Sequence, residues 1–267
     1  MIEVVPTVVS EQAVLAALRE VNDPELDESL VDLGFLHGVR VDGERVEVVL
    51  RLPTFWCAPN FAYLMAHDVR EQALRVPGVR QVRVVLKDHM YADEITEGVS
   101  AGQPFDAVFP GQADGVDLDA LRDLFRAKAF GMRQEQLVRF LLGAGLTDED
   151  VVSLQLDDVL DITDQSGLRL RVGGAERLLS GGAPLVRAYL VRRRRIGLDA
   201  HGSARLVTDL AGAPIASGGL PVHLDRARRQ RISMTFNAIM CRGLLATRYG
   251  LDTDREGGTN VNRHEAT

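Results

Sequence analysis

The sequence is poor in residues on which several protein classes depend. Its 267 residues include two cysteines, Cys57 and Cys241, one tryptophan and only 5% aromatic residues. Two cysteines cannot form the disulfide framework of a small secreted protein. No apolar run approaches the roughly 18 residues that a membrane-spanning helix needs, and the N-terminus lacks the basic flank and apolar core of a signal peptide. We therefore predict a cytoplasmic protein with no membrane partner.

Motifs for nucleotide chemistry and for dedicated metal sites are also missing. The chain contains no Gly-x-x-x-x-Gly-Lys-Ser/Thr loop and no Gly-x-Gly-x-x-Gly element. No histidines have the His-x-x-x-His spacing, and no cysteines the Cys-x-x-Cys spacing, of a permanent metal centre. These absences argue against nucleotide-dependent activity.

Charge is distributed unevenly along the chain. Residues 1–112 hold 9 basic and 18 acidic residues, whereas the remainder holds 22 basic and 20 acidic residues. The net charge of −7 argues against a general nucleic-acid binder. The asymmetry predicts two units with different surfaces.

The first third of the chain predicts an α-β-β-α-β unit. Ser10 can cap a helix that Asn22-Asp23-Pro24 ends. Alternating apolar residues on both sides of Asp42-Gly43 predict a hairpin. A helix over 59–76 and a strand over 82–86 follow. We expect a small mixed sheet with helices on one face.

The remaining sequence predicts a mainly helical region. Glycines and prolines in 96–116 suggest a linker, and the polar residues after Gly250 suggest a disordered tail. The predicted domains are 1–95, the linker 96–116, a helical domain 117–250 and the tail 251–267. Helical stripes are expected at 118–125, 137–142, 185–196 and 224–248, a helix cap at Thr147 and a strand at 168–172.

Cys57 is the residue with the clearest chemical potential. It lies between a predicted strand and a helix that begins near Pro59. Unpaired N–H groups and the positive dipole end at a helix start favour the thiolate, which attacks electrophiles and binds soft metals. A buried, inert cysteine is the other interpretation.

Four elements of the N-terminal unit occur in the order and spacing of a known family. They are 21–26 with Asp23-Pro24-Glu25, 31–34 ending in Gly34, Thr54-x-x-Cys57 before a helix, and 77–79 before the last strand. Over about residues 10–90 the chain resembles the SufT/PaaD-type family of iron–sulfur and metal–sulfur cluster assembly factors.

The resemblance implies a non-catalytic factor that helps load a metal centre onto client apoproteins. The family's functional cysteine corresponds to Cys57, its acidic element to Asp23 and Glu25, and its threonine to Thr54. Many relatives have proline directly after the cysteine, whereas Ala58 intervenes here, which can shift the thiol relative to the helix. Asp-Pro-Glu is also a good turn sequence, so a purely structural role stays open for the two acids.

One cysteine cannot hold a cluster that normally has about four protein ligands. Any iron or iron–sulfur cluster would therefore be transient, bridged between subunits of a homodimer, or completed by a client.

His67 and Cys241 are candidate additional ligands. Solvation on a helix is the alternative for His67, and core packing is the alternative for Cys241. His37 and His89 lie near strand ends and can approach the site. A Cys241 thiolate that meets Cys57 is a hypothesis motivated by the presence of two cysteines.

The run Arg192, Arg193, Arg194 and Arg195 is a candidate partner-binding surface. A solvated helix end, where cations favour the dipole, is the alternative, and phosphate contacts are a further one. Arg226, Arg228, Arg229 and Arg231 form a second basic group.

Three functions are consistent with these patterns. The first is a cluster-assembly or metalloprotein-maturation factor that presents Cys57 and recognises a scaffold or a client, for which a metal-dependent oxygenase is a reasonable guess. The second is an enzyme with Cys57 as nucleophile and His67 or His89 as base. The third is a regulatory protein whose arginines bind an acidic partner or DNA.

Overall fold

The chain forms two compact units. The computed structural model describes residues 9–111, 117–162 and 167–251. One unit combines the chain up to Asp119 with the part from Thr235 onward, and the other comprises Ala120–Met234. The helix α8 (Leu220–Tyr249) therefore gives its first half to the second unit and its second half to the first. The structure thus divides the chain at positions other than the predicted 1–95 and 117–250, because the end of the last helix returns to the N-terminal unit.

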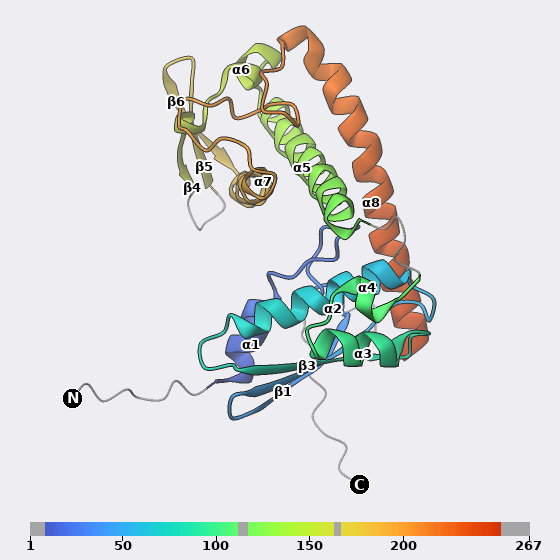
Figure 1. Cartoon of the computed structure of the whole chain (residues 1–267). Coiled ribbons are helices and arrows are strands. Elements are labelled where there is room, and N and C mark those ends of the chain that lie inside the picture. Colours follow the sequence, from blue (N-terminus) through green and yellow to red (C-terminus); the bar gives the residue numbers. More distant parts are fainter. Residues whose placement is uncertain (1–8, 112–116, 163–166, 252–267) are drawn as a thin grey trace, which may run out of the picture. The chain divides into compact units, whose positions relative to one another are not determined.

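The first unit is built on a three-stranded mixed sheet in the order β1-β2-β3 (Figure 1). The strands β1 and β2 form an antiparallel hairpin whose turn contains Gly43 with a φ of 58°. The strand β3 pairs in parallel with β2, and the crossover between them carries α2. The predicted α-β-β-α-β order is confirmed. Its elements are α1 (Glu11–Leu18), β1 (Leu36–Asp42), β2 (Arg45–Arg51), α2 (Pro59–Leu74) and β3 (Gln81–Lys87).

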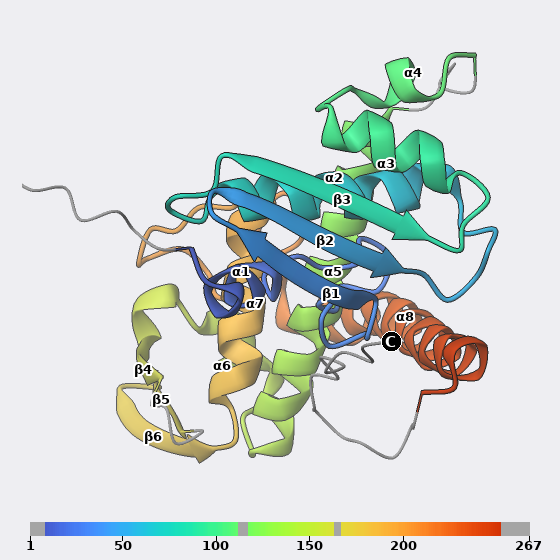
Figure 2. The same ribbon diagram turned by 90° about the horizontal axis from the view of Figure 1, so that it is seen from below.

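The core of this unit lies between one face of the sheet and its helices. Figure 2 shows the sheet with α2 and α3 (Ala92–Ser100) behind it. Alternate residues of β2 and β3 are buried, as expected for strands with one covered face. The Ser10 hydroxyl accepts a bond from the Ala13 N–H at 3.1 Å, which confirms the predicted cap of α1. The buried strand residues are Val46, Val48, Leu50, Val82, Val84 and Leu86.

The segment predicted as a linker is largely folded. It holds the end of α3 and the short helix α4 (Phe105–Val108). Val99, Phe105 and Phe109 are buried in the core of the first unit. The rings of Phe105 and Tyr63 meet edge to face with centroids 5.3 Å apart. The prediction was wrong here because these apolar residues are too few and too close to glycines to show a helical period; residues 112–116 lie outside the described ranges.

The second unit is mainly helical and carries a separate three-stranded sheet. The two helical stripes predicted at 118–125 and 137–142 belong to one helix, α5. The intervening residues favour helix, and a single Gly131 costs only about 1 kcal/mol in a helix interior. Thr147 forms a capping box with Asp150, as predicted for the start of α6. The helices are α5 (Leu118–Gly143), α6 (Asp148–Ser153), α7 (Ala183–Arg195) and the first half of α8, with 3-10 turns at Leu156–Asp158 and Ser217–Gly219.

The second sheet is an antiparallel meander in the order β4-β5-β6. Only its central strand, which contains the predicted 168–172, was foreseen. The outer strands have little apolar alternation, and Leu178 is 68% exposed. The strands are β4 (Val159–Ile162), β5 (Gly167–Val172) and β6 (Ala175–Ser180).

The predicted apolar stripe of the last helix is exposed. Ile232, Phe236, Ile239 and Met240 are each 48–61% exposed. Buried positions of α8 include Ala238 and Leu245. Among the described residues, none of the helices has both the length and the apolar character needed to cross a membrane. The predicted tail from residue 252 onward lies outside the described residues.

Candidate functional site

Cys57 lies in the loop that joins β2 to α2 in the first unit. Ala58 is the N-cap residue of α2 and Pro59 opens the helix, since proline lacks the N–H that a first helical residue leaves unpaired. The predicted position of the thiol beside a helix start is therefore confirmed. The flanking Phe55 and Trp56 are 49% and 72% exposed, while Cys57 itself is half-buried.

The environment of Cys57 does not favour a thiolate, contrary to the prediction. Burial raises the pKa of Cys57 to about 12, and the neighbouring acids Asp23, Cys241 and Glu25 act in the same direction. A hydrogen bond from the Ala58 backbone lowers the pKa by a smaller amount. Desolvation therefore outweighs the helix start, and the free thiol is protonated at neutral pH.

The acidic element Asp23-Pro24-Glu25 forms a tight turn. The Asp23 carboxylate accepts bonds from the backbone N–H groups of Glu25 and Leu26, both at 2.8 Å. Asp23 is 8% exposed. Burial raises its pKa to about 6 despite these two bonds, which lower the pKa. The predicted turn role is confirmed. The same turn also brings the carboxylates of Asp23 and Glu25 close enough to influence the Cys57 thiol.

Cys241 comes to this turn from α8. Its backbone lies one helical turn after Asn237, whose side-chain amide donates to a Glu25 carboxylate oxygen at 3.3 Å. Burial raises the pKa of Cys241 to about 11, and Asp23 and Glu25 raise it further. Both thiols pack against the core of the first unit. The acidic turn thus influences both Cys57 and Cys241, although the two cysteines are 184 positions apart in the sequence.

The end of α8 is attached firmly to the first unit. The Arg248 guanidinium donates to the Leu52 carbonyl at 3.2 Å and to the Asp88 carbonyl. The Arg51 guanidinium stacks 4.8 Å from the centre of the Tyr249 ring. Leu245 is 2% exposed, and a Cβ on Gly34 would lie 3.3 Å from its side chain. Gly34 has a φ of 78°, a backbone conformation that favours glycine.

His89 supports the thiol loop through the backbone. Its Nε2 lies 2.8 Å from the Cys57 carbonyl, and its Nδ1 accepts the Tyr91 N–H at 3.2 Å. Nε2 is therefore the protonated nitrogen, and burial lowers the pKa of this histidine. With both ring nitrogens engaged, His89 orients the loop and has no free nitrogen to accept a thiol proton.

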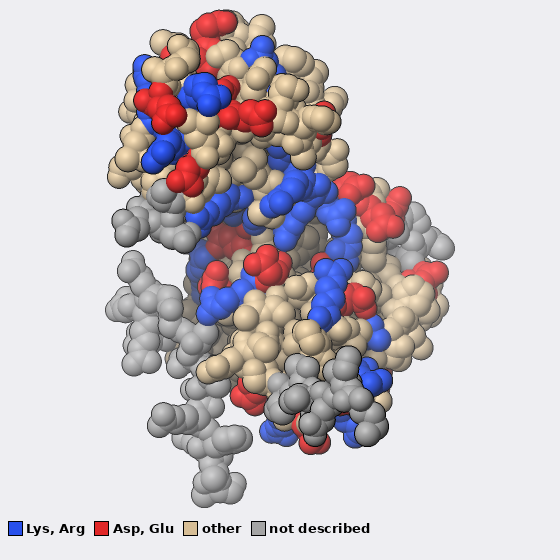
Figure 3. Space-filling model, turned by 90° about the vertical axis from the view of Figure 1, so that its left-hand side faces the viewer, with Lys and Arg blue, Asp and Glu red and all other residues tan. Residues whose placement is uncertain are grey.

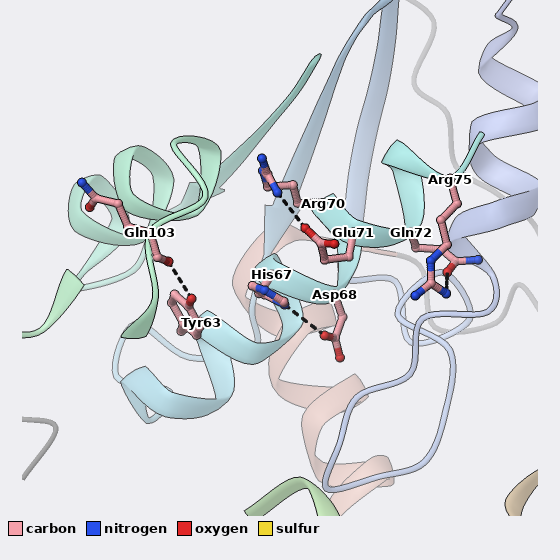
Figure 4. Close-up of polar contacts among 8 residues, drawn as sticks. All are labelled: Tyr63, His67, Asp68, Arg70, Glu71, Gln72, Arg75 and Gln103. Carbon is pink, nitrogen blue, oxygen red and sulfur yellow. Dashed lines mark hydrogen bonds and ion pairs between the residues drawn. The ribbon is translucent and has the colours of Figure 1, made fainter. Parts of the chain in front are cut away.

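His67 does not join the thiols. It lies eight residues after Pro59 on α2, about 12 Å further along the helix axis. Its Nδ1 faces the Asp68 carboxylate at 3.4 Å, as Figure 4 shows, and its ring stacks on Tyr63. Burial lowers the pKa of His37, and the charges that act on it are those of Arg51, Lys87 and Asp88.

Within the described ranges, no three His, Cys, Asp or Glu side chains are arranged to hold one metal ion. Thr54 is half-buried in the loop before Cys57. The site therefore offers two sulfur donors beside two carboxylates, which is short of a complete coordination sphere.

The sequence also contains one motif that was not predicted. Gly98-Val99-Ser100-Ala101-Gly102 has the Gly-x-Ser-x-Gly spacing of a nucleophile elbow. Ser100 ends α3, and its hydroxyl accepts the Val84 N–H at 3.1 Å. A nucleophile elbow requires a turn between a strand and a helix, whereas Ser100 is the last residue of a helix. The spacing alone therefore does not indicate a catalytic serine.

The arginine run does not form one continuous binding surface. Arg193 is 3% exposed and donates to the Asp199 carbonyl at 3.0 Å and to the Tyr189 hydroxyl at 3.3 Å. The prediction of a partner-binding role was wrong for Arg193, because it lies one turn after Tyr189 on the buried face of α7. Arg194 and Arg195 are exposed and Arg192 is half-buried. Figure 3 shows acidic side chains beside basic ones on the molecular face that it draws.

The first unit is similar in sequence to a known protein family. Residues 11–84 match the family model described as iron–sulfur cluster assembly protein. A protein of Deinococcus radiodurans named iron–sulfur cluster carrier protein is 40% identical over 72 residues, which are 27% of this chain and 20% of that protein. An uncharacterized protein of Methanocaldococcus jannaschii is 33% identical over 90 residues, which are 33% of this chain and 93% of that protein. Cys241 lies beyond the residues matched by the family model.

Proposed function

The chain belongs, over residues 11–84, to the iron–sulfur cluster assembly protein family, and on that premise we propose that it delivers iron or an iron–sulfur cluster to a client apoprotein. The family match supports cluster assembly or carriage as the function of the first unit. The observation that carries the proposal is the position of Cys57, the one cysteine of the matched domain, in a loop with exposed neighbours.

The two cysteine sulfurs suit an iron–sulfur cluster that is bound briefly and then passed on. Thiolates are soft ligands that suit iron–sulfur species, and a cluster normally uses about four protein ligands. The first unit offers two cysteine sulfur atoms and no complete metal site among its described residues. The remaining coordination positions therefore belong to the scaffold or the client, which favours hand-over.

Proton exchange accompanies loading in this proposal. The Cys57 thiol must lose its proton when a sulfur–iron bond forms, and the raised pKa makes the proton return readily once iron leaves. The buried Asp23 and half-buried Glu25 add negative charge around the sulfur atoms. This charge penalises the free thiolates and is offset when a cation binds.

A partner protein has an apolar surface to contact beside the thiol. Phe55, Trp56 and Met90 are 46–72% exposed, and the Met90 N–H bonds to the Phe55 carbonyl at 2.9 Å. Exposed aromatic and methionine side chains are enriched in protein interfaces. We propose that the client or scaffold covers this surface during transfer; a metal-dependent oxygenase stays the predicted client.

A transfer assay tests the proposed function. The full chain is reconstituted anaerobically with ferrous iron and sulfide, and cluster passed to an apo-ferredoxin acceptor is followed by absorption and circular dichroism. We expect Cys57→Ser to lose nearly all transfer while its far-UV spectrum and unfolding midpoint match wild type. Leu178→Ser, at an exposed position of β6 in the second unit, is the control and should transfer cluster as wild type does. Full transfer by folded Cys57→Ser would contradict the proposal.

A further inference from the structure

We propose that Cys57 and Cys241 act as a thiolate pair that binds one iron, either as a ferrous ion or as one corner of an iron–sulfur cluster. The inference rests on the proposed function and adds a ligand from outside the family-matched residues. It makes the end of α8 part of the metal-handling site, in addition to its role in packing.

The face of α8 that carries Cys241 is directed at the first unit. Asn237, Cys241 and Leu245 are four residues apart and therefore share one side of the helix. Asn237 bonds to Glu25 at 3.3 Å, and Leu245 is buried beside Gly34. Cys241 lies between these two anchored positions, so its half-buried thiol is held against the same surface as the acidic turn.

Hydrogen bonds also tie the Cys57 loop to the same helix. Arg248 binds the Leu52 carbonyl, five residues before Cys57, and the Asp88 carbonyl. His89, next in sequence, holds the Cys57 carbonyl at 2.8 Å. The thiol loop and α8 thus share a hydrogen-bonded frame. The electrostatic influence of Cys241 on Cys57 is consistent with this proximity.

The chemistry of the pair requires no oxidant or reductant. Each thiol releases one proton to solvent as its sulfur forms a bond to the same iron, and the iron keeps its oxidation state. The two thiolates leave coordination positions for sulfide, water or the ligands of a partner. Asp23 and Glu25 add negative charge to the turn that Asn237 of α8 contacts, which favours a cation over a neutral electrophile.

With such a pair, one chain would be able to hold iron without a second copy. A single thiolate would need bridging between two subunits or an immediate client. Two thiolates on one protomer form a chelate, so the second bond forms at high effective concentration. Wild type should therefore take up one metal per chain at low protein concentration.

Cobalt(II) titration of the full chain under anaerobic conditions tests the pairing, with cobalt as the spectroscopic probe. Wild type should bind one cobalt, show thiolate-to-cobalt charge-transfer absorption for two sulfurs and release two protons into a dilute dye buffer. Both Cys57→Ser and Cys241→Ser should halve the absorption of any complex and weaken binding by more than about 100-fold, beyond the 10–100-fold typical of outer-shell changes. Met240→Ser, an exposed neighbour on α8, should bind as wild type does.

A trivalent arsenical such as phenylarsine oxide provides a second readout on wild type alone, which does not depend on how a variant folds. One arsenical per chain should consume both thiols. Consumption of neither thiol, or unchanged cobalt binding in folded Cys241→Ser, would overturn the pairing. If Cys57→Ser alone abolishes binding and transfer, the proposed function stands without the pair; if wild type passes no cluster at all, the proposed function fails independently.

Discussion

The two units of the chain treat their buried polar groups differently. In the second unit, the Gln134 amide donates to the Tyr189 hydroxyl at 3.2 Å and to the Thr208 carbonyl at 2.9 Å. Arg193 reaches the same tyrosine and the Leu206 carbonyl. Each buried donor in this network has a hydrogen-bond acceptor. The network therefore specifies how α5, α7 and the chain after α7 pack together.

The first unit instead buries acidic groups whose charged forms are disfavoured, mainly by desolvation. Asp23, Cys57 and Cys241 all have raised pKa values, and each of the thiols is disfavoured as an anion by its acidic neighbours. Such an arrangement contributes nothing to stability in the ionised form. Clusters of perturbed pKa values are typical of functional sites, which is consistent with the function proposed for the first unit.

The reactivity of Cys57 is expected to show the largest effect of this difference. Its pKa lies about three units above that of an ordinary thiol, which lowers the thiolate fraction at pH 8 about 1000-fold. Iodoacetamide should therefore alkylate Cys57 far more slowly in the native chain than in urea, as measured by peptide mass spectrometry. The rate should rise with pH throughout the range from 7 to 10. Native alkylation as fast as in urea at pH 8 would show that the thiol is not held protonated.

Removal of Arg193 should produce the next largest effect, and on stability alone. Arg193→Ala deletes several hydrogen bonds from a buried cation and leaves their acceptors unsatisfied, at a cost of about 3–5 kcal/mol. Arg194→Ala, the exposed neighbour on the same helix, is the matched control and should change the free energy of unfolding very little. Urea unfolding followed by circular dichroism measures both. If both substitutions lowered the free energy of unfolding equally, the buried hydrogen bonds of Arg193 would not be what stabilises the second unit.

A smaller effect is expected for Asp23 and depends on pH. Its folded pKa of about 6 exceeds its ordinary value of 3.8. The protonated carboxyl is therefore favoured by folding, and this stabilisation is complete below pH 3.8 and lost as pH rises through 6. The loss is about 2–3 kcal/mol.

Asp23→Asn tests that dependence. The amide oxygen can still accept the Glu25 and Leu26 N–H bonds, but the group no longer titrates. The variant should lose this component of the stability change between pH 4 and 7, and should lower the pKa of the Cys57 thiol. An identical pH profile of unfolding free energy in both proteins would show that Asp23 is not strained by burial.

Local patterns were sufficient to predict the α-β-β-α-β order of the first unit. The turn at Asp42-Gly43, the alternation in β2 and β3 and the proline at the start of α2 each act within a few residues. The same holds for the cap at Thr147. The second sheet was missed because β6 has almost no buried residue and thus no apolar alternation.

The site was predictable in its residues but not in its environment. Cys57, Asp23 and Glu25 follow from spacing and family resemblance. The return of α8 depends on contacts such as Asn237 with Glu25, which are 212 residues apart, and no local pattern encodes them. The thiolate prediction failed for a related reason: a helix start is visible in the sequence, whereas desolvation of the thiol by distant segments is not.

Cluster transfer to an apo acceptor tests the central claim most directly. Wild type and Cys57→Ser are reconstituted anaerobically side by side, and the cluster that reaches the acceptor is quantified with iron and acid-labile sulfide. The account predicts transfer by wild type and almost none by a folded Cys57→Ser protein. Equal transfer by the two proteins would contradict it.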